Sequence, residues 1–251
     1  MSANFTKGIG ISTYNRGKNI AEVIEAILLT KPNNAKVIIA DDGSTDNTAE
    51  IIRKGFPSLT YIRGENVGVG GNKNRLMHSL RNYDFIAILE DDLVPIENGW
   101  FETYMKFCLN TNIHHLCRVQ DRFVEETVPD FAIWCKKELG MTPIYGPTPR
   151  GDMAFITHMV LRKVGAFHPK FIGCGHAHGN WSDRIAASGL IGHPNKWIDI
   201  KEASVKFKQL GDTEGGRWAD PKKEIQKQIT KNAKLRKQLG SDSLYLDTVL
   251  P

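Results

Sequence analysis

The sequence predicts an α/β protein with a mostly parallel central sheet flanked by helices. Three observations support this fold class. Short apolar runs alternate with segments of helical apolar spacing, turns rich in Asp, Asn and Gly separate them, and two of the runs end in clusters of carboxylates. This alternation extends over about the first 95 residues and favours right-handed βαβ units.

Four strands and three helices are expected in this first part of the chain. The strands are predicted at 7–13, 37–40, 59–62 and 85–89. Apolar residues at helical spacing predict helices that include 20–28, 51–52 and 76–80. Asp46 is a suitable N-cap for the second helix, and 68–71 is expected to be a flexible loop before the third.

The pattern changes after Pro95. Residues 100–109 have the spacing of a helix, whereas 111–150 are irregular. A short apolar strand or helix is expected at 153–156, and a late strand at 197–207. A loop rich in Gly and His spans 171–179, and a helix is expected to start at Trp181.

The two carboxylate clusters, 41–42 and 90–92, follow predicted strands about fifty residues apart. Ligands of open α/β sheets bind just beyond the carboxyl ends of the strands, so both clusters are expected in one crevice. Mg²⁺ and Mn²⁺ prefer oxygen ligands and bind through one or two carboxylates together with substrate phosphates. The clusters therefore suit a divalent cation and a phosphorylated ligand.

Five short motifs occur in a fixed order: Tyr14-Asn15-Arg16, the run 41–46, Asn66-Val67-Gly68, Asn72-Lys73-Asn74 and Glu90-Asp91-Asp92. In order and spacing they resemble the nucleotide-binding half of family 2 glycosyltransferases with the GT-A fold. The resemblance is strong over about residues 7–95 and weaker over 150–190. It implies a metal-dependent, inverting hexosyl- or pentosyltransferase that moves a sugar from a nucleotide donor, with a UDP-sugar favoured, to an acceptor hydroxyl.

The resemblance also assigns residues to the nucleotide: Thr13, Tyr14, Asn15, Arg16, Asp41, Asp42, Lys73 and Asp91. Asp41 is expected to accept a hydrogen bond from the uracil N3–H, and a turn cap is the structural alternative. Lys73 stands where relatives often carry an Arg, so it keeps the charge but loses the bidentate fork.

The motif 90–92 resembles the family's DxD motif with Glu in the first position. Asp92 is the first candidate for a Mn²⁺ or Mg²⁺ ligand, and Glu90 is the second. A divalent ion on the pyrophosphate oxygens stabilises the negative charge of the leaving nucleotide. Adjacent carboxylates after a buried strand are also costly to bury without a cation.

The catalytic base is the main departure from the family pattern. Relatives carry Glu-Asp followed by an Arg six residues after the Asp, and here Ala177-His178 precedes Arg184. His178 is the first candidate for the base because a neutral imidazole titrates near pH 7. Asp183 and Asp152 are the alternative candidates for the base. Because the Glu-Asp pair is replaced, a protein that binds a sugar nucleotide without transferring it is the alternative to an enzyme. His176 and His178 on an extended segment would share a face and could ligate the metal.

The resemblance divides the chain into a donor-binding half at 1–95, an acceptor-binding half at 96–215 and a basic, helical tail at 216–251. Seven Lys and Arg and one Glu lie between 222 and 237, so this segment carries a formal charge of +6 in a chain of net +5. The acceptor is expected to be a glycan or a lipid-linked glycan. DNA bound through the basic tail, as in viral enzymes that glycosylate a modified base, and a protein side chain are the alternatives. Residues 215–218 have the composition of a lid.

No apolar stretch approaches the length of a membrane span, and the first residues lack the pattern of a signal peptide. The four cysteines show no CxxC spacing and are expected to be free thiols. These features favour a cytoplasmic protein.

Overall fold

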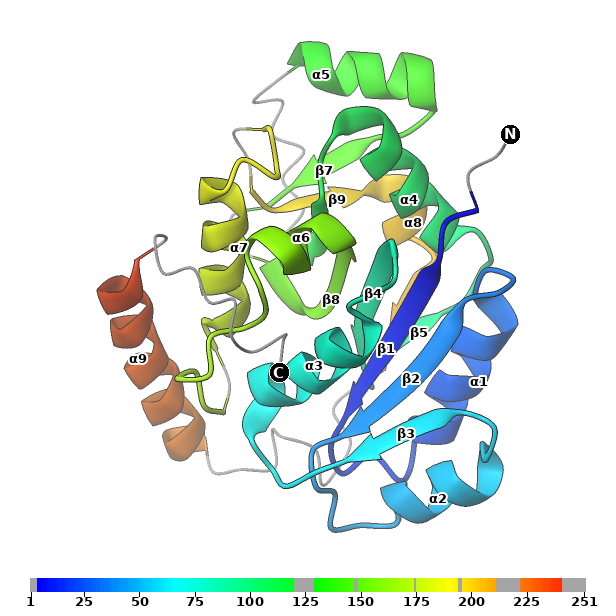
Figure 1. The fold of residues 1–251 in the computed structure, drawn as a ribbon, viewed down its shortest axis with the longest axis vertical. Helices are drawn as coiled ribbons and strands as arrows, with labels where there is room; N and C mark the ends of the chain where they lie inside the picture. Colours follow the sequence, from blue (N-terminus) through cyan, green and yellow to red (C-terminus); the bar gives the residue numbers. More distant parts are fainter. Residues whose placement is uncertain are drawn as a thin grey trace.

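The computed structural model describes residues 4–119, 129–146, 149–173, 175–193, 196–210 and 222–240. Its centre is a six-stranded sheet of order β3-β2-β1-β4-β8-β6. The strands are β1 (Lys7–Thr13), β2 (Lys36–Asp41), β3 (Thr60–Arg63), β4 (Phe85–Glu90), β6 (His115–Val119) and β8 (Pro149–Thr157). The predicted α/β class with a mostly parallel sheet is confirmed (Figure 1).

The register of the sheet brings the carboxyl ends of its parallel strands together. Ser12 of β1 is opposite Ala40 of β2 on one side and Glu90 of β4 on the other. β8 runs antiparallel to β4 and pairs Met153 with Leu89, so its first residues lie beside the end of β4. The acidic clusters after β2 and β4 therefore lie at one edge of the sheet.

Helices α1 (Ile20–Thr30) and α2 (Thr48–Gly55) lie on the opposite face of the sheet from α3 (Gly68–Leu80) (Figure 1). α1 forms because its apolar residues recur at helical spacing, and the fully buried members of that stripe are Ile20, Val23, Ile24 and Ile27. The N-cap of α2 is Asn47 rather than the expected Asp46, but Asp46 accepts hydrogen bonds from the backbone N–H and the hydroxyl of Thr48, the first residue of the helix.

The expected flexible loop at 68–71 is wrong, because these residues form the first turn of α3. The carboxylate of Asp42 accepts hydrogen bonds from the N–H groups of Val67 and Gly68, two of the donors that a helix start leaves free. Gly68 has a φ of +82°, which favours glycine. Asp42 and Gly68 together let the helix begin earlier than its apolar spacing indicates.

The second half of the chain is more regular than its sequence indicates. It contains α4 (Trp100–Thr111), α5 (Pro129–Trp134), a π-helical turn (Cys135–Leu139), β7 (Pro143–Tyr145), α6 (His158–Lys163) and α7 (Ala177–Ala187). The irregular stretch expected at 111–150 thus includes the edge strand β6. α7 begins at Ala177 rather than at Trp181, so His178 lies in its first turn.

The single late strand expected at 197–207 is also wrong. The segment forms β9 (Ile198–Ile200) and α8 (Lys201–Ser204), and β10 (Phe207–Gln209) follows. β9 pairs with β7, and β10 pairs antiparallel with β5 (Leu93–Pro95). This pairing places Gln209 opposite Leu93, directly beside the acidic end of β4.

Helix α9 (Lys222–Leu239) lies at the edge of the molecule beside α7 (Figure 1). Arg236 of α9 forms an ion pair with Asp183 of α7, with a nitrogen–oxygen distance of 2.6 Å. Among the helices of the described ranges, none combines the length and the apolarity needed to cross a bilayer. The lid expected at 215–218 and the ends of the predicted tail, 216–221 and 241–251, lie outside the described residues. The three predicted divisions of the chain remain predictions.

Candidate donor and metal site

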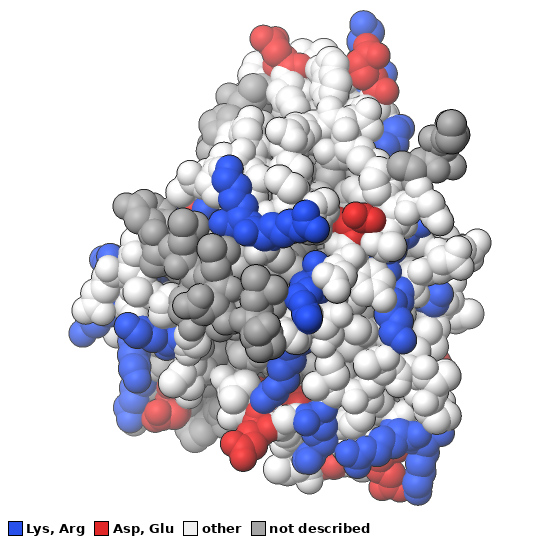
Figure 2. Space-filling view, viewed as in Figure 1, with Lys and Arg blue, Asp and Glu red and all other residues white. Residues whose placement is uncertain are grey.

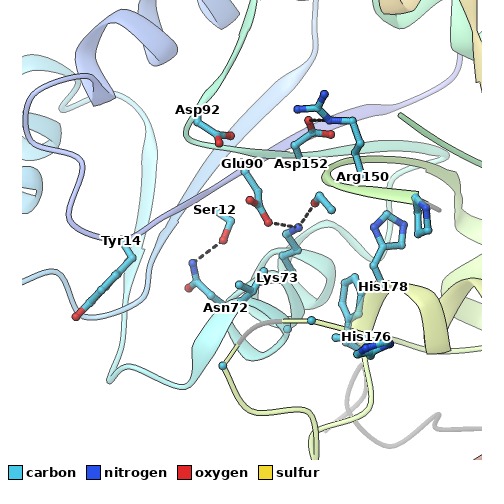
Figure 3. A pocket seen from close by; sticks show the side chains of 18 of the residues that line it. Ser12, Tyr14, Asn72, Lys73, Glu90, Asp92, Arg150, Asp152, His176 and His178 are labelled. Carbon is cyan, nitrogen blue, oxygen red and sulfur yellow. Dashed lines mark hydrogen bonds and ion pairs between the residues drawn. The ribbon is translucent and has the colours of Figure 1, made fainter. Parts of the chain in front are cut away.

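A cavity of about 620 Å³ opens at the carboxyl edge of β1, β2 and β4 (Figure 3). Its volume is in the range of small-molecule sites. Ten of the predicted site residues line it: Thr13, Tyr14, Arg16, Asp42, Lys73, Glu90, Asp91, Asp92, Asp152 and His178. Asn15, Asp41 and Asp183 are not part of this lining as far as the described residues show.

Asp41 is fully buried and holds the turn after β2. Its Oδ1 accepts hydrogen bonds from the backbone N–H and the hydroxyl of Ser44, at 2.8 and 2.6 Å. Its Oδ2 accepts a hydrogen bond from the Tyr61 hydroxyl. These contacts occupy both carboxylate oxygens of Asp41. The expected contact to a uracil remains a prediction, and it requires one of these hydrogen bonds to be replaced by a hydrogen bond from the base.

Asp91 orders the loop that follows β1. Its carboxylate accepts hydrogen bonds from the backbone N–H of Tyr14 and from Nε of Arg16, both at 3.0 Å. Burial raises the pKa of Asp91, and the Arg16 guanidinium opposes that rise. Tyr14 and Arg16 are therefore held at the cavity wall by the middle residue of the acidic cluster.

Asp92 has one satisfied and one unsatisfied oxygen. Oδ2 accepts a hydrogen bond from the Gln209 amide at 2.9 Å, whereas Oδ1 is shielded from solvent and has no partner among the described residues. Burial, together with the carboxylates of Glu90, Asp91 and Asp152, raises the pKa of Asp92 to about 7. A hard divalent cation would satisfy Oδ1 and neutralise this repulsion, so the residues fit the predicted metal.

Lys73 lies near the centre of the cavity (Figure 3). Its side chain is 4% exposed, and its ammonium group donates hydrogen bonds to Oε1 of Glu90 at 2.7 Å and to the carbonyl of Gly151. This cation beside the acidic cluster is placed to contact a diphosphate. Helix α3 fixes it there because Asn72, the preceding residue, hydrogen-bonds to Ser12 and to the carbonyl of Ala40.

The three candidates for a catalytic base differ in their surroundings. Asp183 forms ion pairs with Lys196 and Arg236. Asp152 lines the cavity, and its Oδ2 accepts hydrogen bonds from Arg118 at 2.8 Å and from Arg150 at 2.9 Å. Its Oδ1 is shielded and makes no hydrogen bond within the described part of the chain. Burial raises the pKa of Asp152 although both guanidinium groups lower it.

His178 is held in an aromatic environment beside β6. Both ring nitrogens are shielded and have no hydrogen-bond partner among the described residues. Burial lowers the pKa of His178 well below its ordinary value, and the His115 ring, 5.5 Å away between centroids, adds to that effect. The expected extended HxH segment is wrong, because His176 has a φ of +64° and precedes the helix that contains His178.

Several residues in or near the candidate site were not predicted from the sequence. Gln209 reaches Asp92 from a strand whose pairing with β5 has no local signal. Arg118 and Arg150 flank Asp152. His115 and Cys117 lie on β6, where their i, i+2 spacing would have placed them on one face had the strand been predicted.

Comparison with known proteins identifies the family. The model of glycosyl transferase family 2 matches residues 9–166. "Uncharacterized glycosyltransferase R363" of Acanthamoeba polyphaga mimivirus is 27% identical over 223 residues, which are 82% of each chain.

Two solved structures share the GT-A fold. Glucosyl-3-phosphoglycerate synthase from Mycobacterium tuberculosis, in complex with Mn²⁺, UDP and phosphoglyceric acid, aligns with a TM-score of 0.59 at 17% identity, covering 93% of this chain and 79% of that one. Mannosyltransferase PcManGT from Pyrobaculum calidifontis, in complex with GDP-Man and Mn²⁺, aligns with a TM-score of 0.54 at 17% identity, covering 76% of this chain. This chain spans 54% of the length of that mannosyltransferase. With the matched motifs in place around one cavity, the chain belongs to glycosyl transferase family 2.

Proposed function

We propose that this protein is a metal-dependent, inverting glycosyltransferase that transfers a sugar from a UDP-sugar to an acceptor hydroxyl. One observation carries the proposal: the shielded Oδ1 of Asp92 has no partner among the described residues, and Asp92 lines a cavity together with Glu90, Asp91 and Asp152. A shielded carboxylate oxygen without a partner is costly to bury, and a cation would remove that cost. Asp92 and Glu90 would hold it, with Gln209 beside them.

Other residues of the cavity would contact the diphosphate and the nucleoside of the donor. When bound, Mn²⁺ or Mg²⁺ would act as a Lewis acid that lowers the energy of the developing charge on the diphosphate. Lys73 would contact the same phosphates, and Tyr14 and Arg16 would flank the nucleoside. Burial of these charges strengthens each contact, because the effective dielectric constant inside the cavity is low.

Asp152 is our proposed base, since it lines the cavity and its Oδ1 has no hydrogen-bond partner among the described residues. Asp152 would take the proton of the acceptor hydroxyl while the acceptor oxygen bonds to the anomeric carbon. The bond from that carbon to the phosphate oxygen breaks, and the nucleoside diphosphate leaves with the electron pair. Attack from the side opposite the leaving group inverts the anomeric centre. Asp183 is a weaker candidate because two cations already pair with it.

A thermal-shift panel of UDP, GDP, CMP and dTDP, each with Mn²⁺ and with EDTA, tests the donor site. A ligand at about 100 times its Kd stabilises by roughly 2.7 kcal/mol, which is about 5–10 °C for a domain of this size. We expect this shift with UDP and Mn²⁺ and its loss with EDTA. A shift with GDP alone would assign a guanosine donor, and no shift with any nucleotide would contradict the proposal.

Release of UDP from a panel of UDP-sugars tests transfer. Asp152→Asn should bind UDP normally and lose turnover, with Asp130→Asn, at an exposed carboxylate, as the control that keeps it. If wild-type protein binds UDP but never turns over a donor, with or without acceptor, the chain is a sugar-nucleotide-binding protein instead.

The acceptor is proposed to be a glycan or a lipid-linked glycan. DNA is a second candidate because α9 presents an exposed row of Lys227, Lys231, Lys234 and Lys237. Figure 2 shows Lys and Arg side chains gathered along the edge where α9 lies. A salt-dependent gel shift with duplex DNA separates the two candidates, since phosphate contacts weaken steeply with salt. Absence of a shift at low salt would exclude DNA.

A further inference from the structure

We propose that His115, Cys117 and His178 form a second metal site and that Zn²⁺ is the ion that fits its ligands best. Each residue offers one ligand atom, and these atoms lie within 4.8 Å of one another. The site is separate from the carboxylate cluster around Asp92 and shares no ligand with it. It does not depend on the proposed transferase activity.

Two elements that are far apart in the sequence build this cluster. β6 places His115 and Cys117 on the same face, two residues apart. α7 contributes His178 from its first turn, and Trp181 one turn later packs against both histidine rings, at centroid distances of 5.3 and 6.0 Å. Helices and strands fix ligands more precisely than loops do.

The unsatisfied nitrogens of the cluster point to a ligand. Both ring nitrogens of His178 are shielded from solvent and lack hydrogen bonds to any described residue, and Nδ1 of His115 is shielded as well, with the His115 ring close to the backbone of Phe155. A buried polar atom without a partner costs about 1–3 kcal/mol, so the two of His178, on one ring, need an explanation. A metal ion would accept the lone pairs of two of these nitrogens, one from each ring.

The surroundings of His115 already orient it as a ligand. Its Nε2 lies 3.0 Å from the hydroxyl of Ser182, and a proton held there leaves the Nδ1 lone pair free. A hydrogen bond from the second nitrogen is the usual way in which proteins orient a metal-bound histidine. Asp152 and Asp199 lie near enough to Cys117 to act electrostatically on its thiol, and their negative charge favours a cation.

The ligand types select the metal. One thiolate and two imidazoles suit Zn²⁺, whereas Mg²⁺ and Mn²⁺ prefer the carboxylates of the other site. Tetrahedral Zn²⁺ separates such ligand atoms by roughly 3.5 Å, so the three side chains would move together by about 1 Å. The metal–sulfur bond forms as the Cys117 thiol releases its proton to solvent.

Three protein ligands leave one tetrahedral position. His178 also lines the cavity, so the metal site lies beside it. A water molecule or another oxygen ligand from the cavity would complete the coordination. His178 would then serve as a metal ligand rather than as a base.

Cobalt binding tests the proposal, because Co²⁺ gives a thiolate charge-transfer absorption only when a cysteine coordinates it. The full chain with Asp92→Asn, which disables the carboxylate site, is stripped with a chelator and titrated with Co²⁺ and then Zn²⁺. We expect one Co²⁺ per chain, the charge-transfer band, and loss of the band as Zn²⁺ displaces Co²⁺. Cys117→Ser should abolish the band and His178→Ala should weaken binding by about 100-fold or more.

Cys108→Ser is the matched control, because Cys108 is a buried free cysteine outside the cluster, and it should leave the band unchanged. Circular dichroism checks that each variant is folded. Should Cys117→Ser fail to fold, X-ray absorption at the zinc edge of the unmodified protein replaces it, and we expect one sulfur neighbour together with two nitrogens and one oxygen. Absence of the cobalt band in the Asp92→Asn chain, or a zinc ion with oxygen ligands only, would overturn the proposal.

Discussion

Replacing Asp92 with Asn should stabilise the metal-free protein. Burial and the surrounding carboxylates raise the pKa of Asp92 from its ordinary value of 3.8 to about 7 in the folded state. Between these two values the folded state binds more protons than the unfolded state, so the free energy of unfolding falls as pH rises from about 4 to about 7. The amide of the Asp92→Asn variant carries no charge, so the variant should not show this loss.

The size of the effect follows from the shift in pKa. A rise in pKa of about 3 corresponds to about 4 kcal/mol, and partial exposure of Asp92 reduces our expectation to about 2 kcal/mol. For a chain of this length that is roughly 4–8 °C in Tm. The difference between Asp92→Asn and the wild type should grow from pH 4 to pH 7 and stay constant above pH 7.

Thermal unfolding in EDTA from pH 4.5 to pH 8 measures this difference, with Asp130→Asn at an exposed carboxylate as the control. Addition of Mn²⁺ and UDP should then make the wild type the more stable of the two proteins, because only the wild type keeps the carboxylate that binds the cation. An Asp92→Asn protein that is no more stable than the wild type at pH 8 in EDTA would refute the electrostatic reasoning. Equal stabilisation of both proteins by Mn²⁺ and UDP would refute the assignment of Asp92 as a metal ligand.

Three further outcomes are expected. Lys73→Ala should weaken UDP binding by about 10-fold or more in calorimetric titration, with Lys73→Arg intermediate, because the cation beside Glu90 is lost; unchanged affinity would contradict this. Arg184→Ala should lower the free energy of unfolding, measured in urea, by about 3–5 kcal/mol, since it removes buried hydrogen bonds to two backbone carbonyls and leaves a cavity. A loss below about 1 kcal/mol would contradict a stabilising role for these hydrogen bonds. Asp183→Asn should release α9 from its contact through Arg236 and speed proteolysis of the tail while UDP binding is unchanged; unaltered cleavage would show that this ion pair does not hold the helix.

The sequence predicted the donor half of the fold well because each element there carries its own signal. β1 was predicted with the bounds that the structure has, and the carboxylate clusters mark the strand ends that form the cavity. The start of α3 was predicted too late because a distant carboxylate, Asp42, supplies the cap. Such a contact depends on the register of β2 and leaves no trace near Gly68 in the sequence.

The acceptor half was predicted less well because its elements depend on tertiary contacts. β6 follows a short turn and pairs only with β8 among the described strands, so its five residues lack the flanking signals of a strand. The rule that i, i+2 residues share a face was applied to His176 and His178, where the chain passes from a left-handed residue into a helix. It holds for His115 and Cys117, where the chain is extended.

The loop after β1 is ordered by hydrogen bonds within the protein itself. The backbone N–H of Asn15 bonds to Ser44, that of Arg16 to Thr48, and the Asn15 side chain accepts from Thr45. The conformational entropy of this loop is therefore lost during folding rather than on ligand binding. The donor-side wall is therefore preorganised, and nucleotide association should follow a single fast phase whose rate depends on ionic strength rather than on rearrangement of this loop.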